Sequence, residues 1–572
     1  MDRQKGPLLV RDNYLVTTEA GTIEGMADKG CAVYRGVPYA QPPVGNLRFR
    51  SPVAPEPWDG VRPAQAYGPA SCQMNSRNRD RVLQHLEDLN RGLPPVLAFP
   101  AYTTTYVMDE ECSEDCLYLN VWVPEGAEGE ALPVFVYYHG GANFVSSGNF
   151  DMEDGATMAR EQRVIVVRPT YRLGALGWVH FGLLDDRLGE AVNVGVQDQL
   201  HALRWVYRNI AAFGGDPEKI TIGGESCGAT GVSHLMMIPE AQRYARRAVI
   251  QSLSPFNVWC SQERPDAVTV AQIYLEILGL TDAQELMTID PEKLLAVHLL
   301  MLRFWPLDRN QTWRPLGSVA TGEFQRKIPA QALAQDAYPR QDFELLIGFA
   351  KDEWQFYRGH TETMQNGTRD QVLAVIEQVF GTEAVPLYER FQQMHPDEKP
   401  GQTLNRIMSM EFFQFSSLLI AQNLSAQGIP VYAFQFSYDL PGAGGYLRAH
   451  HTGDIPFIFR NLDEDLLGRF ETYDGVDRTE LDRLSRQFAD MYGSFIRTGN
   501  PGEAWPAFDA ASQTVLWLGK EIEPRANLMT REVQAFADAG VDSVSELEAR
   551  MVRNVRAAIN TPARAFVPSA AG

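Results

Sequence analysis

The stretch from Ile220 to Gly231 constrains the fold of this 572-residue chain more than any other. It opens with alternating β-branched residues, which favour a strand, and turns abruptly through small residues into a run typical of a helix, Val232 to Met237. One glycine stands two places before Ser226 and another two places after it. A turn tight enough to lift a serine hydroxyl above a sheet strains the serine backbone, and flanking side chains would clash. The segment therefore predicts a nucleophile turn, although a plain glycine-rich β-turn has the same pattern.

The rest of the chain alternates apolar runs with amphipathic helices. Apolar runs typical of buried strands cover 133–138, 163–167, 248–251, 343–348 and 431–438, and helices are expected over 196–213, 480–498 and 533–560. This alternation predicts an α/β protein with a mostly parallel twisted sheet and helices on both faces. Because no linker divides the sequence, 1–572 is expected to form a single domain.

Four segments are expected to lie outside this regular pattern. The prolines of 34–49 predict an extended, irregular segment laid over a surface. The stretch 72–116 is expected to be a long loop over the active-site entrance. The segments 265–335 and 355–430 are expected to be helical insertions that shape the pocket.

The charge balance narrows the function classes. With 72 acidic against 51 basic residues the formal net charge is −21, which argues against binding to nucleic acid or to an anionic membrane surface. No apolar stretch is long enough to span a bilayer, and Met1 to Gly6 leads into no apolar segment. We therefore expect a cytoplasmic monomer or homodimer. A periplasmic or secreted protein without its signal peptide is the alternative.

A serine nucleophile needs a base and an acid, which in α/β-hydrolases follow it in the order acid, then base. The adjacent pair His450 and His451 lies on an irregular segment just after a predicted strand, where a catalytic base belongs. Asp352 and Glu353 follow another predicted strand, and the residues alone leave the choice between these two carboxylates open. A polar surface loop and a solvated strand end are the alternative interpretations of the two sites.

Donors for an oxyanion are predicted in the segment that begins at His139. Gly140, Gly141 and Ala142 follow a buried apolar strand, and their small side chains allow backbone N–H groups to approach a bound carbonyl closely. A plain turn would not need two adjacent glycines and an alanine.

Together these segments resemble the type-B carboxylesterases, the family of cholinesterases, liver-type carboxylesterases and bacterial para-nitrobenzyl-type esterases, which have the α/β-hydrolase fold. The resemblance spans nearly the whole chain, and the residues that carry it are Tyr34 to Phe49, Glu114 to Val121, His139 to Gly141, Asn193 to Gly195 with Asp198 and Gln199, and Phe213 to Pro217 running into Gly224, Glu225 and Ser226.

The resemblance implies a role for each candidate residue. It assigns the acid to Glu353, which ends a Lys-Asp-Glu motif, and the base to His451, three residues before Asp454. It matches Gly141, Ala142 and Cys227 to the oxyanion donors. Apart from the resemblance, Glu225 and Gly140 are expected to bind the substrate, and Glu225, beside the nucleophile, is expected to give the pocket a negative bias.

The resemblance also implies structural pairs. The family disulfide corresponds to Cys72 and Cys116, with Cys112 as a competing partner, and a buried ion pair corresponds to Arg48 and Glu114.

Two departures from the family are visible. Cys227 stands where relatives usually have a smaller or less reactive residue, so it adds bulk and a thiol beside the nucleophile. The loop 72–116 lacks the tryptophan with which cholinesterases hold a quaternary ammonium, so choline specificity is not expected.

The expected reaction is hydrolysis of carboxylic esters through an acyl-enzyme, with a small-molecule ester as partner and without cofactor or metal. Small to medium aryl or alkyl esters, xenobiotic esters and natural-product esters are the expected substrates. The alternatives are a triacylglycerol lipase and, in a different class, a non-catalytic cholinesterase-like binding protein.

Overall fold

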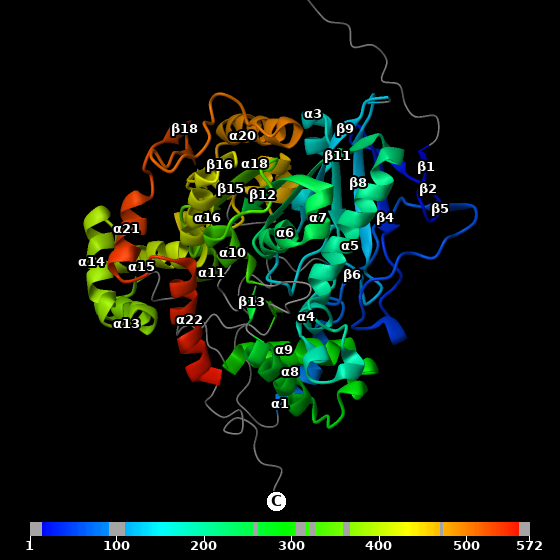
Figure 1. Ribbon diagram of the computed structural model, residues 1–572, viewed down its shortest axis with the longest axis horizontal. Coiled ribbons are helices and arrows are strands. Elements are labelled where there is room, and N and C mark those ends of the chain that lie inside the picture. Colours follow the sequence, from blue (N-terminus) through cyan, green and yellow to red (C-terminus); the bar gives the residue numbers. More distant parts are fainter. Residues whose placement is uncertain are drawn as a thin grey trace, which may run out of the picture.

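The computed structural model describes residues 14–90, 109–127, 129–254, 261–262, 264–304, 316–319, 327–358, 366–469 and 473–559. These residues form an 11-stranded sheet with the order β18-β17-β16-β15-β12-β11-β9-β10-β8-β4-β3 (Figure 1). Its strands are β3 (Met26–Asp28), β4 (Cys31–Pro38), β8 (Tyr118–Pro124), β9 (Leu132–Tyr138), β10 (Ile165–Pro169), β11 (Gly215–Glu225), β12 (Ala245–Gln251), β15 (Glu344–Ala350), β16 (Val431–Phe436), β17 (Val515–Leu518) and β18 (Ile522–Arg525).

The middle of the sheet is parallel. Every neighbouring pair from β10 across to β17 is parallel, whereas β3, β4, β8 and β18 join at the edges in antiparallel pairs. Parallel strands end at the same edge of a sheet, so β11, β12 and β15 bring their carboxyl ends together. This architecture confirms the predicted α/β-hydrolase fold with a mostly parallel sheet.

Alternate side chains of β9 enter two different cores, one on each face of the sheet. Val134 and Val136 belong to the first core, and Phe135 and Tyr137 to the second. The helices that contribute to the first core include α5 (Val194–Asn209), α6 (Cys227–Met237) and α16 (Phe415–Ala426). Those of the second core include α3 (Ala156–Gln162), α18 (Ile455–Phe459) and α20 (Arg478–Thr498). Such burial on both faces explains the continuous apolar runs of the central strands.

Most of the described residues of both predicted insertions are helical, and the first insertion also contains a short strand, β14 (Ser318–Val319). The first contains α8 (Arg264–Leu278), α9 (Pro291–Phe304) and α10 (Pro329–Gln335). The second contains α11 (Gln355–Arg358), α13 (Arg369–Phe380), α14 (Ala384–Met394), α15 (Pro400–Ser409) and α16. Within 72–116, α1 (Arg79–Asn90) packs on α9 below the sheet in Figure 1. Residues 91–108 lie outside the described part, so the placement of this loop over the entrance stays a prediction.

Two local predictions were wrong. The segment 34–49 is not irregular throughout, because its first residues belong to β4, which pairs antiparallel with β8 and has Pro38 only as its last residue. The C-terminal helix is divided into α21 (Thr530–Asp538) and α22 (Val544–Ile559). Gly540 has a φ of +76° between them, a conformation that ends a helix and that glycine adopts without strain.

The predicted disulfide between Cys72 and Cys116 is not formed, and Cys72, Cys112 and Cys116 are free thiols. Burial raises the pKa of Cys72 and of Cys116, and it raises the pKa of Cys112 to about 11. A raised pKa disfavours the thiolate that a disulfide requires. A side-chain hydrogen bond from Asn75 at 3.1 Å also occupies Cys112.

Among the helices that the structure describes, none is both long and apolar enough to cross a bilayer.

Candidate active site

Ser226 stands at the sharp turn between β11 and α6, at the carboxyl end of the strand. Its φ of 55° and ψ of −123° lie in a region that strains any residue with a side chain, as expected of a nucleophile turn. Its amide donates to the carbonyl of Gln251 at 3.0 Å, which fixes the turn against β12. Among the described residues, none hydrogen-bonds to Oγ, and the side chain lines a pocket.

Glycines allow this turn to pack closely. A Cβ on Gly224 would lie 2.5 Å from the backbone of Gly228, and one on Gly228 would lie 2.0 Å from the carbonyl oxygen of Tyr138. A Cβ on Gly140 would lie 2.6 Å from Oε2 of Glu225. A Cβ atom does not approach other heavy atoms this closely, so the spacing of glycines around the serine has the steric reason that the sequence predicts.

His451 and Glu353 are joined by a hydrogen bond. Nδ1 of His451 lies 2.6 Å from Oε2 of Glu353, and both residues are buried. The other carboxylate oxygen of Glu353 accepts from the amide of Ala350 at 2.7 Å. Phe413 packs against the imidazole with ring centroids 4.8 Å apart. These contacts fix the ring orientation, as an acid that orients a catalytic base must do.

The neighbouring candidates Asp352 and His450 face elsewhere. Oδ1 of Asp352 accepts from the side chain of Asn405 at 3.0 Å. Nδ1 of His450 contacts the carbonyl of His451, and its ring stacks on Phe356 at 5.7 Å. Burial lowers the pKa of His450 to about 4. Of the two carboxylates and the two histidines, Glu353 and His451 are the ones that contact each other.

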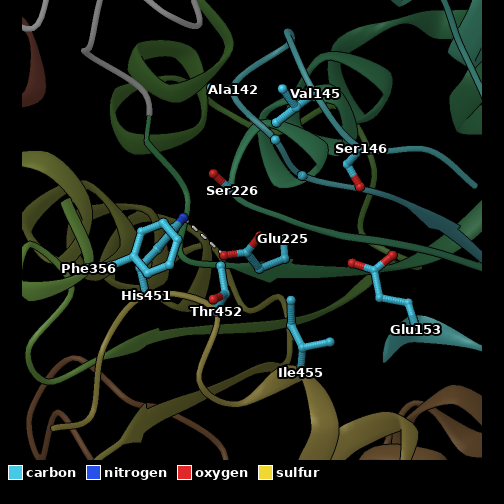
Figure 2. A pocket seen from close by; sticks show the side chains of 12 residues that line it. Ala142, Val145, Ser146, Glu153, Glu225, Ser226, Phe356, His451, Thr452 and Ile455 are labelled. Atoms are coloured by element: carbon cyan, nitrogen blue, oxygen red, sulfur yellow. Dashed lines mark ion pairs between the residues drawn. The ribbon is translucent and has the colours of Figure 1, made fainter. Parts of the chain in front are cut away.

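The second ring nitrogen of His451 faces Glu225. Nε2 lies 3.1 Å from Oε1 of Glu225, and Figure 2 shows this ion pair as a dashed line below Ser226. Burial raises the pKa of Glu225 well above its ordinary value, and the carboxylates of Asp454, Glu353 and Glu153 raise it further. The residue predicted to give the pocket a negative bias is thus a direct partner of the candidate base.

The predicted oxyanion loop lies in the same pocket as Ser226. Gly141 and Ala142 have φ values of +99° and +57°, and a Cβ on Gly141 would lie 2.1 Å from the carbonyl oxygen of Val145. Among the described residues, none accepts a hydrogen bond from the amides of Gly141 and Ala142. Cys227, whose amide is the third predicted donor, begins α6 directly after Ser226. Amides at a helix N-terminus and in such a turn attract negative charge.

The thiol of Cys227 is only 1% exposed. A buried thiol is inert toward reagents in solution, because the reactive thiolate needs solvent or a cationic neighbour. The burial of Cys227 therefore does not support the reactivity that the sequence suggests for this position.

Buried carboxyl groups continue behind the site. Oδ2 of Asp454 accepts from Gln251 at 2.9 Å, and Gln251 in turn accepts from the hydroxyl of Tyr492 at 2.8 Å. Burial raises the pKa of Asp454 to about 6. Burial likewise raises the pKa of Glu153 to about 7, although its ion pair with Arg168 lowers it in part.

Glu153 and Arg168 are site residues that the sequence reasoning missed. Glu153 lines the pocket, and Arg168 lies on β10 with no solvent exposure. A signal was present, since an arginine that follows Ile165, Val166 and Val167 in a strand buried on both faces requires a buried partner.

Ser226 lies in a pocket between the oxyanion loop and the loop of His451, with about 400 Å³ of space that includes open solvent. Figure 2 shows Phe356 and Ile455 among the side chains that line it. Phe356 comes from the predicted insertion 355–430, so this insertion contributes a wall of the pocket.

Two further clusters lie away from this pocket. Arg48 and Glu114 form the predicted ion pair, with Nε 2.7 Å from Oε2, and Arg48 also donates to the carbonyl of Ile289 at 2.7 Å. His85, Asp290 and Glu292 bring one ligand atom each within 4.8 Å of one another, and these are the described side chains grouped so as to suit a metal ion. Neither cluster shares a residue with the pocket of Ser226.

Comparison with known proteins agrees with this geometry. The model of the carboxylesterase family matches residues 12–536. The chain is 32% identical to phenmedipham hydrolase of Pseudarthrobacter oxydans over 518 residues, which cover 88% of this chain and 94% of that protein. It is 30% identical to para-nitrobenzyl esterase of Bacillus subtilis over 524 residues, which cover 89% of this chain and 95% of the relative.

Solved structures show the same fold. A carboxylesterase of Geobacillus stearothermophilus superposes with a TM-score of 0.76 at 31% identity and covers 91% of this chain and 99% of its own. A para-nitrobenzyl (PNB) esterase superposes with a TM-score of 0.75 at 29% identity, with the same coverage of both chains. The chain therefore belongs to the carboxylesterase family and is a serine ester hydrolase with the α/β-hydrolase fold.

Proposed function

We propose that the protein hydrolyses carboxylic esters through a triad of Ser226, His451 and Glu353 and a covalent acyl-enzyme. The observation that carries this proposal is the 2.6 Å hydrogen bond between His451 and Glu353 beside a strained serine that opens into the same pocket. Nucleophilic catalysis requires a base that is oriented by a buried carboxylate and that shares a pocket with a serine hydroxyl, and none of the described residues hydrogen-bonds to the hydroxyl of Ser226.

In the first step Oγ of Ser226 forms a bond to the ester carbonyl carbon while Nε2 of His451 takes its proton. Because Nε2 contacts Glu225 at 3.1 Å in this structure, the ring nitrogen must exchange that partner for the serine hydroxyl before attack. Glu353 stabilises the imidazolium that results.

The tetrahedral intermediate places its negative oxygen on the amides of Gly141, Ala142 and Cys227. Each such donor contributes about 3 kcal/mol to lowering the barrier. The intermediate collapses as the bond to the leaving oxygen breaks and His451 returns its proton to that oxygen. Water then cleaves the acyl-enzyme by the same route and regenerates Ser226.

We propose small to medium aryl or alkyl esters, xenobiotic esters and natural-product esters as substrates. The names of relatives, which include phenmedipham hydrolase, para-nitrobenzyl esterase and acylcarnitine hydrolase, support a proposal of xenobiotic, aryl and natural-product esters.

The test is hydrolysis of a short-chain para-nitrophenyl ester by the wild type and by Ser226→Ala. The variant is expected to lose turnover, and an organophosphonate is expected to label the wild type at Ser226 and to leave the variant unlabelled. Unchanged turnover in the variant, or a wild type that takes no label, would overturn the proposal.

A further inference from the structure

One buried carboxyl group of the pocket has no part in the proposed mechanism. Glu153 is 2% exposed and lines the same pocket as Ser226 and His451. In the view of Figure 2 its carboxylate lies on the opposite side of Glu225 from the His451 ring, below Ser146. The two glutamates are close enough for the charge of Glu153 to raise the pKa of Glu225.

Glu153 is fixed by a single cation. Among the described residues, only Arg168 donates to this carboxylate, and it bonds to Oε2. Oε1 therefore keeps its acceptor capacity, and a carboxylate can accept several hydrogen bonds. Arg168 is held in turn by the carbonyl of Phe150 at 2.7 Å and that of Ser147 at 3.2 Å, so it cannot follow a displaced carboxylate.

We propose that Oε1 of Glu153 is the specificity-determining acceptor for a neutral hydrogen-bond donor, a hydroxyl or an amide N–H, on the alcohol part of the ester. This inference rests on the proposed ester hydrolysis, because it concerns the substrate that the same pocket takes. A fixed, buried acceptor discriminates strongly, since a substrate that lacks the donor leaves it unpaired.

The direction of proton transfer places the hydrogen-bond donor on the alcohol part of the ester. His451 must return the proton from Nε2 to the leaving oxygen, so the alcohol part begins beside this nitrogen. Nε2 contacts Glu225, and Glu225 stands between His451 and Glu153 in Figure 2. Because Glu153 lines the same pocket as His451 and Glu225, we expect a leaving group that extends from Nε2 along the pocket to contact Glu153.

We infer that the substrate group that binds Glu153 is uncharged, because the pocket has no uncompensated negative charge. Arg168 already balances Glu153, and burial among carboxyl groups favours the uncharged form of Glu225. A substrate ammonium would lose its hydration and gain no carboxylate of its own, which is unfavourable in a buried site. A hydroxyl or an amide loses much less on entry.

The test compares matched esters of one short acyl group. Mono-esters of linear diols of increasing chain length are paired with their O-methyl ethers, which keep the length and lack the donor, and with the esters of the corresponding amino alcohols. At the length that reaches Glu153, wild-type kcat/KM is expected to favour the hydroxyl ester over the methyl ether and over the ammonium ester by about tenfold or more.

The ratio between hydroxyl ester and methyl ether is then measured in Glu153→Leu/Arg168→Met, which replaces the ion pair by apolar side chains and leaves no buried charge unpaired. The ratio is expected to fall to about one. Glu153→Gln keeps the side-chain volume and is expected to lower the ratio at least about threefold, so the test does not depend on folding of the double variant. The control is Arg247→Met/Glu344→Leu, which removes an ion pair of 3.1 Å near the amino ends of β12 and β15, away from the pocket. This control variant should keep the wild-type ratio between hydroxyl ester and methyl ether.

Three results would overturn the inference: a wild-type ratio near one at every chain length, a ratio that survives in the Glu153 variants, or a preference for the ammonium ester. A wild type that hydrolyses none of the esters would instead contradict the proposed function.

Discussion

Nε2 of His451 lies 3.1 Å from Oε1 of Glu225, the residue that directly precedes Ser226, and both side chains are 2% exposed. The nitrogen that takes the serine proton in the proposed mechanism is thus within reach of a buried carboxyl group as well as of the substrate. This relationship ties the activity of the base to the protonation of Glu225.

Replacement of Glu225 by glutamine tests that link. Because the pKa of Glu225 is raised well above its ordinary value, the carboxyl group becomes anionic only as the pH rises, and the anion then stabilises the imidazolium. We expect kcat/KM of Glu225→Gln to fall below that of the wild type by a factor that grows as the pH rises. The measurement is the ratio of the two profiles from about pH 5 to about pH 9. A ratio that does not change with pH would show that Glu225 does not titrate in this range.

The adjacent residues Asp352 and Glu353 provide a matched test of which carboxylate is the acid of the triad. Glu353→Gln is expected to lower kcat by about 10³ to 10⁴, because the imidazole loses the partner that orients it and stabilises its charge. Asp352→Asn is the control, since Asp352 binds Asn405 and does not contact His451 in the structure, and its kcat should change less than about tenfold. Steady-state kinetics on one para-nitrophenyl ester decides the comparison. Similar losses in both variants would contradict the assignment.

Glu411 offers a test of stability against pH. It lies within a short π-helix, Met410–Gln414, and burial raises its pKa to about 8. The unfolded chain ionises Glu411 near pH 4.5 and the folded chain only near pH 8, so this group removes stability as the pH rises between these values. The loss amounts to up to about 5 kcal/mol in the free energy of unfolding.

Glu411→Gln should therefore gain stability over the wild type as the pH rises from about 5 to about 8. Urea unfolding of both proteins at several pH values measures the difference between their free energies of unfolding. If this difference does not change with pH across the range, Glu411 is as easily ionised in the folded protein as in the unfolded chain.

Free thiols at Cys72 and Cys116 predict that reductant does not affect stability. A disulfide that closed this loop would contribute about 4 kcal/mol, so its reduction would lower the unfolding temperature by several degrees. We expect equal unfolding temperatures with and without reductant, and alkylation of both cysteines in the denatured, unreduced protein. A bridged peptide in a non-reducing digest would refute the free-thiol state.

The sequence by itself determined the fold and most of the candidate site. The strand, the glycine turn and the helix around Ser226 are local features, and close packing leaves no alternative to glycine at Gly224 and Gly228. The parallel sheet followed from apolar runs that are buried on both faces, and such periodicity is set by neighbouring residues.

Tertiary structure decided which side chains meet. Asp352 and Glu353 are equivalent as residue types, and only the path of the chain after β15 directs Glu353 to His451 and Asp352 to Asn405. The contact of Glu225 with His451 and the pairing of Glu153 with Arg168 join residues that belong to different elements of the fold. The absence of a bridge between Cys72 and Cys116 likewise depends on how their buried thiols are placed. Local propensity reports on the neighbours of a residue in the chain, whereas hydrogen bonds, ion pairs and pKa values depend on its neighbours in space.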